Sequence, residues 1–225
     1  MENNYKKKSI YFRILDKVQR RNRGNFFIIL KNYYYYFNSK INKFTKDKRA
    51  YILNQIKTNS VIAEIGVWQG EFSNEILKKA LPKKLVLVDS WYYNKNIRGC
   101  APQVQGKEPL SQKFFDEAKK STYNKFKGLD HVLIFDINSK NASKKFNDNY
   151  FDYIYIDGEH SFSAVYDDLT YWFPKLKKNG IIFGDDFYWR EEDNSFSVKK
   201  AYEKFILEKN IKKWCVFKSQ ICLIK

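Results

Sequence analysis

Short apolar runs and helical patterns alternate along the middle of the chain. Runs rich in β-branched and aromatic residues predict strands, and apolar positions spaced three and four apart predict helices. The predicted strands are residues 60–65, 84–88, 131–135, 153–156 and 181–183. The predicted helices are residues 72–80, 111–119, 163–176 and 198–209. Regular alternation of this kind is typical of βαβ units and predicts an α/β fold built on a mostly parallel sheet.

The chain ends in two short apolar runs, 213–217 and 221–224, which only three polar residues separate. This spacing predicts an antiparallel hairpin at the edge of the parallel sheet.

A long loop is predicted between the second strand and the second helix. Residues 92–110 contain Pro102, Gly106 and Pro109 and predict a long irregular loop, of the kind that often covers or forms a binding site.

Charge is concentrated at the start of the chain. The whole sequence carries 42 Lys and Arg against 25 Asp and Glu, a net charge of +17. Residues 1–50 hold 14 of the basic residues and 3 of the acidic ones, a net of +11, so the rest of the chain contributes only +6. We therefore divide the chain into a basic, aromatic-rich, helical N-terminal segment, 1–50, and a domain, 51–225. The joint abundance of Lys, Asn, Ile, Tyr and Phe also fits an AT-rich genome, which explains part of the Lys excess without function.

Composition excludes several classes of protein. A content of 44% hydrophobic and 18% aromatic residues excludes intrinsic disorder. Three cysteines without a paired CxxC spacing indicate neither a disulfide framework nor a structural zinc site. The apolar runs of the N-terminal segment are far shorter than the roughly 20 residues of a membrane-spanning helix, and charges interrupt any signal-peptide core. These features predict a cytoplasmic protein, with membrane-surface contact through residues 1–50 as an added possibility.

A glycine-containing turn follows the first predicted strand. Residues 64–70 read Glu-Ile-Gly-Val-Trp-Gln-Gly, in which Gly66 allows a tight turn and Gly70 precedes the next helix. Asp89 ends the second strand, where a carboxylate can accept hydrogen bonds from a ribose diol or instead cap the following turn. The glycine spacing differs from the G-x-G-x-x-G of dinucleotide-binding proteins and disfavours a nicotinamide cofactor.

Acidic residues also follow the fourth and fifth strands. Asp157 and His160 come after one, and Asp185 and Asp186 after the other. Because the carboxyl ends of parallel strands meet at one edge, these side chains should converge there. Carboxylates held together repel one another unless some are protonated or a cation neutralises them, and oxygen ligands suit Mg²⁺. The unperturbed pKa of a histidine side chain lies near neutral pH, which makes His160 a candidate general base. Each acid taken alone is more often a turn or cap residue.

The glycine turn and the acid after the second strand together resemble the class I S-adenosylmethionine-dependent methyltransferases. This resemblance covers about residues 55–225 and implies a Rossmann-like seven-stranded sheet, mostly parallel, with the antiparallel C-terminal hairpin. It further implies that Glu64, Gly66 and Gly70 hold the methionine part of the cofactor and that Asp89 holds its ribose. It also implies that the exit of the third strand, where Asp136 and Asn138 lie, contacts adenine.

The second half of the chain narrows the resemblance. The pattern I-D-G-x-H, then a D-L-x-x-W helix, then G-x-I-x-G-D-D is similar to metal-dependent sugar O-methyltransferases. That likeness implies Mg²⁺ on Asp157, Asp185 and Asp186, with His160 deprotonating the acceptor hydroxyl and His160 and Asp157 as the catalytic pair. Asn179 stands where this branch more often has a second glycine.

These observations predict methyl transfer from S-adenosylmethionine to a sugar hydroxyl of a small molecule or glycan, assisted by Mg²⁺. The alternative is a nucleic-acid methyltransferase whose basic N-terminal segment contacts phosphates. No Asn-Pro-Pro-Tyr-like motif supports that alternative, and nucleic acid is the less favoured partner. Residues 1–50 could also mediate oligomerisation.

Overall fold

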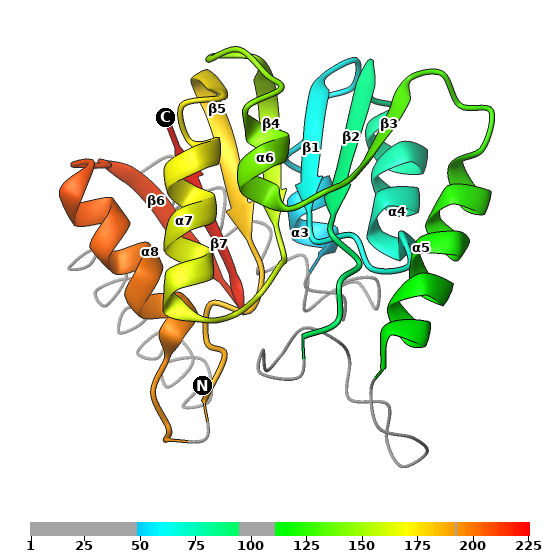
Figure 1. Ribbon diagram of the computed structural model, residues 1–225. Helices are drawn as coiled ribbons and strands as arrows, with labels where there is room; N and C mark the ends of the chain where they lie inside the picture. Colours follow the sequence, from blue (N-terminus) through cyan, green and yellow to red (C-terminus); the bar gives the residue numbers. More distant parts are fainter. Residues whose placement is uncertain (1–48, 95–110, 192) are drawn as a thin grey trace, which may run out of the picture.

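The computed structural model describes residues 49–94, 111–191 and 193–225 (Figure 1). The predictions for the N-terminal segment therefore lie, apart from its last two residues, outside the described part. Most of the predicted loop at 92–110 lies outside it as well. No described helix has the length and apolar character needed to cross a membrane.

Helices and strands alternate through the described part much as the sequence pattern predicts. The strands are β1 Val61–Ile65, β2 Lys84–Asp89, β3 Val132–Asp136, β4 Phe151–Ile156, β5 Leu176–Gly184, β6 Lys213–Phe217 and β7 Gln220–Ile224. The helices are α3 Ala50–Leu53, α4 Glu71–Ala80, α5 Gln112–Phe126, α6 Ser139–Ser143, α7 Phe162–Trp172 and α8 Ser197–Glu208.

The strands form one seven-stranded sheet in the order β3-β2-β1-β4-β5-β7-β6. Strands β1 to β5 pair in parallel, whereas β7 pairs antiparallel with both β5 and β6. The predicted Rossmann-like sheet with an antiparallel C-terminal hairpin is thus confirmed. The register brings the ends of three strands level, because Ile65 lies beside Val88 on one side and Ile156 on the other. Their carboxyl ends point downward in Figure 1.

Side chains of the central strands alternate between two hydrophobic cores. Ala63, Ile65 and Ile154 pack in the core that includes residues of α6, α7 and α8. Ile62 and Leu87 pack in the core on the other face, with residues of α3, α4 and α5. Since neighbouring residues of a strand point to opposite faces, helices on both faces bury the sheet and explain its nearly continuous apolar runs.

Some of the predicted helix boundaries are wrong. The helix predicted over 163–176 ends at Trp172, because Pro174 lies in the turn that follows and β5 already begins at Leu176. The short helix α6 was not predicted, since five residues give too little periodicity to detect. Helix α5 continues to Phe126, beyond the predicted end at residue 119.

Candidate active site

Gly66 lies where β1 leaves the sheet and runs close to the end of β4. Its φ is +85°, and a Cβ added to it would lie 2.1 Å from the carbonyl oxygen of Asp157. Its amide donates to Val88 O at 2.9 Å, while the amide of Asp157 donates to Ile65 O at 2.8 Å. The glycine is therefore required both by the backbone conformation and by the close approach of two strand ends.

Gly70 begins helix α4 and packs against α5. Its φ is +75°, and a Cβ there would lie 2.7 Å from the ring edge of Phe126. Trp68, between the two glycines, also has a positive φ of 53°. The turn from Gly66 to Gly70 is thus held in a left-handed backbone conformation at three positions, as a tight loop beyond the strand end requires.

Glu64 is buried beneath this turn. Its side chain is 2% exposed, and it accepts a hydrogen bond of 2.5 Å from the Ser73 hydroxyl of α4. Burial raises the pKa of Glu64 to about 8, against a lowering by the hydrogen bond from Ser73. The carboxyl therefore connects β1 to α4, and its predicted role toward the methionine part of the cofactor stays a prediction.

The raised pKa of Glu64 predicts a pH-dependent stability. An acid whose pKa is higher in the folded state stabilises the fold below its unfolded pKa, and that stability is lost as pH rises through the folded value. Unfolding free energy should thus fall between about pH 4.5 and about pH 8. Glu64→Gln should remove on the order of 3–5 kcal/mol of this decline. Urea unfolding at pH 5, 7 and 9 measures it, with Glu117→Gln, an exposed position of α5, as control. Equal pH profiles for wild type and Glu64→Gln would contradict the prediction.

Asp89 closes the turn from the neighbouring strand. One carboxylate oxygen accepts from the amides of Val67 and Trp68, each at 2.9 Å, and the other accepts from the amide of Trp91 at 2.8 Å. The capping role considered from the sequence is therefore present. A carboxylate has about four acceptor sites, so the predicted ribose contact is compatible with these bonds and stays a prediction.

Asp136 ends β3, and Asn138 follows two residues later at the same edge. Asp136 forms a salt bridge with Lys119 of α5. Asn138 caps helix α6, because its side-chain oxygen accepts from the amide of Asn141 at 2.9 Å. Both side chains thus have local structural partners, and their predicted contact with adenine stays a prediction.

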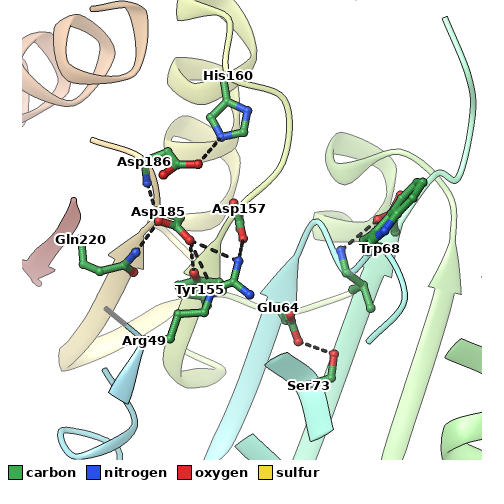
Figure 2. Close-up of polar contacts among 12 residues, drawn as sticks. Arg49, Glu64, Trp68, Ser73, Tyr155, Asp157, His160, Asp185, Asp186 and Gln220 are labelled. Carbon is green, nitrogen blue, oxygen red and sulfur yellow. Dashed lines mark hydrogen bonds and ion pairs between the residues drawn. The ribbon is translucent and has the colours of Figure 1, made fainter. Parts of the chain in front are cut away.

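The acids after β4 and β5 separate into two groups (Figure 2). Asp157, His160 and Asp186 each offer one ligand atom, and these atoms all lie within 4.8 Å of one another. His160 Nε2 lies 3.4 Å from Asp186 Oδ2. The side chain of Asp185 points the other way, toward Tyr155 and Gln220. Of the three predicted metal ligands, the structure therefore brings Asp157 and Asp186 together with His160, and the ligand role of Asp185 stays a prediction.

Asp185 is 1% exposed and surrounded by donors. One of its oxygens accepts from the Tyr155 hydroxyl at 2.8 Å and from Arg49, and the other accepts from Gln220 and from the amide of Asp186. Adjacent residues at a strand end point to opposite faces of a sheet, which separates Asp185 from Asp186. Asp186, with φ +48° and a side chain 30% exposed, turns toward His160.

Arg49 is a residue of the candidate site that the sequence pattern did not indicate. Its guanidinium forms salt bridges with Asp157 and, at 3.2 Å, with Asp185. It also lies 5.1 Å from the ring centroid of Phe72. Fourteen basic residues occur in the first fifty, and no spacing distinguishes this one. It precedes α3, the helix that packs on the same face of the sheet as α4.

The pKa of Asp157 depends on burial and on neighbours of both signs of charge. Burial and the nearby Asp185 raise the pKa of Asp157 to about 7, although Arg49 and His160 act to lower it. A buried carboxyl among other acids resists ionisation unless a cation is close. The site thus favours the binding of positive charge next to Asp157.

His160 is oriented by two contacts. Its ring stacks on Trp189, with centroids 4.6 Å apart and an interplanar angle of 25°. Its Nε2 faces the carboxylate of Asp186. A histidine paired with a carboxylate and held against an aromatic ring is well placed to accept a proton from a hydroxyl group.

A cavity of about 10 Å³ adjoins the cluster and is lined by Asp157, His160, Asp185 and Tyr202, among others. Among the described residues, none forms a hydrogen bond with the buried hydroxyl of Tyr202. This volume is close to that of a single small ligand such as water. The orphaned hydroxyl, two carboxylates and an imidazole supply oxygen and nitrogen atoms, which divalent cations accept as ligands.

Comparison with known proteins identifies the family. A family model described as "Methyltransferase domain" matches residues 63–187, which include Glu64, Gly66, Asp157 and Asp186. A search of the curated proteins found no match.

Among solved structures, a Staphylococcus aureus protein assigned as a caffeoyl-CoA O-methyltransferase is 15% identical, with 96% of this chain and 99% of that chain covered and a TM-score of 0.53. A Clostridium thermocellum protein assigned as an rRNA methylase is 15% identical, with 79% and 92% covered and a TM-score of 0.54. The O-methyltransferase NovP is 15% identical, with 77% and 74% covered and a TM-score of 0.50. At such identities these likenesses show the fold alone. Because the family model covers more than half of the chain, the protein belongs to the methyltransferase-domain family and is an S-adenosylmethionine-dependent methyltransferase.

Proposed function

We propose that the protein transfers the methyl group of S-adenosylmethionine to a sugar hydroxyl with the help of a divalent cation, Mg²⁺ first. The observation that carries this proposal is the cluster of Asp157, His160 and Asp186 next to the glycine turn. It combines a general base with acidic ligands at the sheet edge where ligands of open α/β sheets bind.

The residues would divide the work as follows. Asp157 and Asp186 would hold the cation, which when bound supplies Lewis acidity to the acceptor hydroxyl. His160 would take the proton of that hydroxyl, while the carboxylate of Asp186, which faces Nε2, and the ring of Trp189 would fix the imidazole. The turn from Gly66 to Gly70 and the carboxylate of Asp89 would position the cofactor beside the acceptor. Correct positioning is the larger part of catalysis in such a transfer.

Aromatic side chains around the cluster support a sugar acceptor. Trp189 stacks on His160, while Tyr188, next to it, is 47% exposed and Phe162, two residues after His160, is 37% exposed. Aromatic rings offer an apolar face together with a polar edge, which suits the mixed apolar and hydroxylated faces of a sugar ring.

Formation of S-adenosylhomocysteine tests the proposal. Free, nucleotide-linked and lipid-linked sugars should be assayed with S-adenosylmethionine, each beside the deoxy sugar that lacks one hydroxyl. We expect turnover with at least one sugar and loss of that turnover with the matching deoxy sugar. EDTA should abolish turnover, and added Mg²⁺ or Mn²⁺ should restore it. Turnover that EDTA leaves unchanged would contradict the role of the cation, and methylation of RNA or DNA in place of sugars would favour the alternative.

A further inference from the structure

We propose that Arg49 is an internal counter-ion of the active site, which competes with the divalent cation for Asp157. This inference rests on the proposed function, because it concerns the cation that the function requires. Arg49 is the residue whose guanidinium reaches both Asp157 and Asp185 from the segment that precedes α3 (Figure 2).

The hydrogen bonds of Asp185 indicate that Asp185 holds Arg49, whereas Asp157 is shared between Arg49 and the divalent cation. Arg49 Nε and Nη2 lie 3.3 and 3.2 Å from the same Asp185 oxygen that accepts from Tyr155. Gln220 and a backbone amide take up the other oxygen. With its acceptor sites occupied, Asp185 serves as the anchor of Arg49, while Asp157 faces both Arg49 and the cluster with His160 and Asp186.

Charge explains why the two cations oppose each other. The carboxylates of Asp157, Asp185 and Asp186, when ionised, and the guanidinium of Arg49 leave a net charge of −2, which a divalent cation would balance. A guanidinium that binds Asp157 itself nevertheless lies next to the candidate cation position. Coulomb repulsion between a guanidinium and a divalent cation that share one carboxylate in a partly buried site is larger than the gain from ordering that carboxylate. Electrostatic competition should therefore outweigh any help that Arg49 gives by positioning Asp157.

The same geometry links the site to the start of the domain. The amide of Leu53 in α3 donates to Arg49 O at 3.1 Å, and three residues of α3, namely Tyr51, Ile52 and Leu53, are buried in the core. The backbone of Arg49 is thus held by a packed helix, while its side chain is 32% exposed. A fixed backbone and a long, partly exposed side chain allow the guanidinium to leave the carboxylates without unfolding of α3.

Binding of Mn²⁺ to the full chain, measured by calorimetry without S-adenosylmethionine or acceptor, tests the inference. Arg49→Gln removes the charge, and Arg49→Met removes it but keeps an apolar stem beside Phe72. We expect both variants to bind Mn²⁺ about tenfold or more tightly than wild type. Arg49→Lys keeps one positive charge and should stay within about threefold of wild type, as should Lys83→Gln, an exposed charge removed elsewhere. Circular dichroism and thermal unfolding verify that each variant is folded.

The outcomes separate this inference from the proposed function. Mn²⁺ binding to wild type that is unchanged or weakened in both charge-removing variants overturns the role of Arg49 and leaves the cation site standing. No Mn²⁺ binding to wild type or to any variant overturns both the cation site and the competition. Tightening in Lys83→Gln equal to that in Arg49→Gln overturns the inference too, because overall charge would then explain the effect.

Discussion

Replacing His160 with alanine should lower kcat by about 10²–10⁴-fold and leave the affinity for S-adenosylmethionine within about threefold of wild type. The reason is that His160 faces Asp186 and stacks on Trp189, whereas the predicted cofactor residues lie at the turn from Gly66 to Gly70. Single-turnover assays measure the chemical step, and calorimetry measures cofactor affinity.

The same variant decides between two roles for the imidazole. If His160 is the base, Mn²⁺ affinity should change little in His160→Ala, and the loss of kcat should be smaller at high pH, where hydroxide replaces the base. His131→Ala, at the exposed histidine just before β3, is the matched control and should retain most of kcat. A loss of Mn²⁺ affinity that parallels the loss of kcat would show that His160 is a ligand, and a loss of cofactor affinity would contradict the division of roles.

Gly66→Ala should destabilise the fold by about 3 kcal/mol or more, the largest stability effect that we expect for a single methyl group. A Cβ at this position would lie 2.1 Å from Asp157 O and 2.5 Å from Asp157 C, both of them backbone atoms that cannot rotate away. The strand ends of β1 and β4 would have to separate, and overpacking of this kind adds to the cost of a positive φ. Urea unfolding measures the loss, and cofactor affinity should fall with it.

Gly128→Ala isolates the contribution of the backbone conformation. Gly128 has a φ of +78°, close to that of Gly66, but nothing lies within 4 Å of the position of its Cβ. Its substitution should cost only about 1 kcal/mol, from the strain of the left-handed conformation. Equal losses in the two variants would show that the close approach of β1 and β4 adds nothing to the requirement for Gly66.

The sequence pattern predicted the sheet better than it predicted the boundaries after β4. Apolar runs such as residues 153–156 predict strands because a strand buried on both faces has few polar residues. The same criterion failed at Leu176, where the polar residues Lys177, Lys178 and Asn179 lie inside β5. Tertiary pairing with Phe151 overrode the local pattern there.

The sequence predicted which acidic residues and which histidine form the candidate site, but only part of their arrangement. Convergence of Asp157, His160 and Asp186 follows from parallel strands that end at one edge, and the sequence alone supports it. The separation of Asp185 from Asp186 depends on which face each residue points to, and the positive φ of Asp186 is a feature of the folded turn.

The local pattern of the sequence thus determined the fold class, the edge at which the site lies and the residues that gather there, because periodicity and strand-end position are encoded residue by residue. The tertiary structure alone decided that Arg49 forms salt bridges with Asp157 and Asp185, that Asp89 accepts from the amides of Val67 and Trp68, and that the ends of β1 and β4 approach too closely at Gly66 for a side chain. The physical reason is that a salt bridge between residues 49 and 185 depends on packing of distant elements, to which no local spacing in the sequence corresponds.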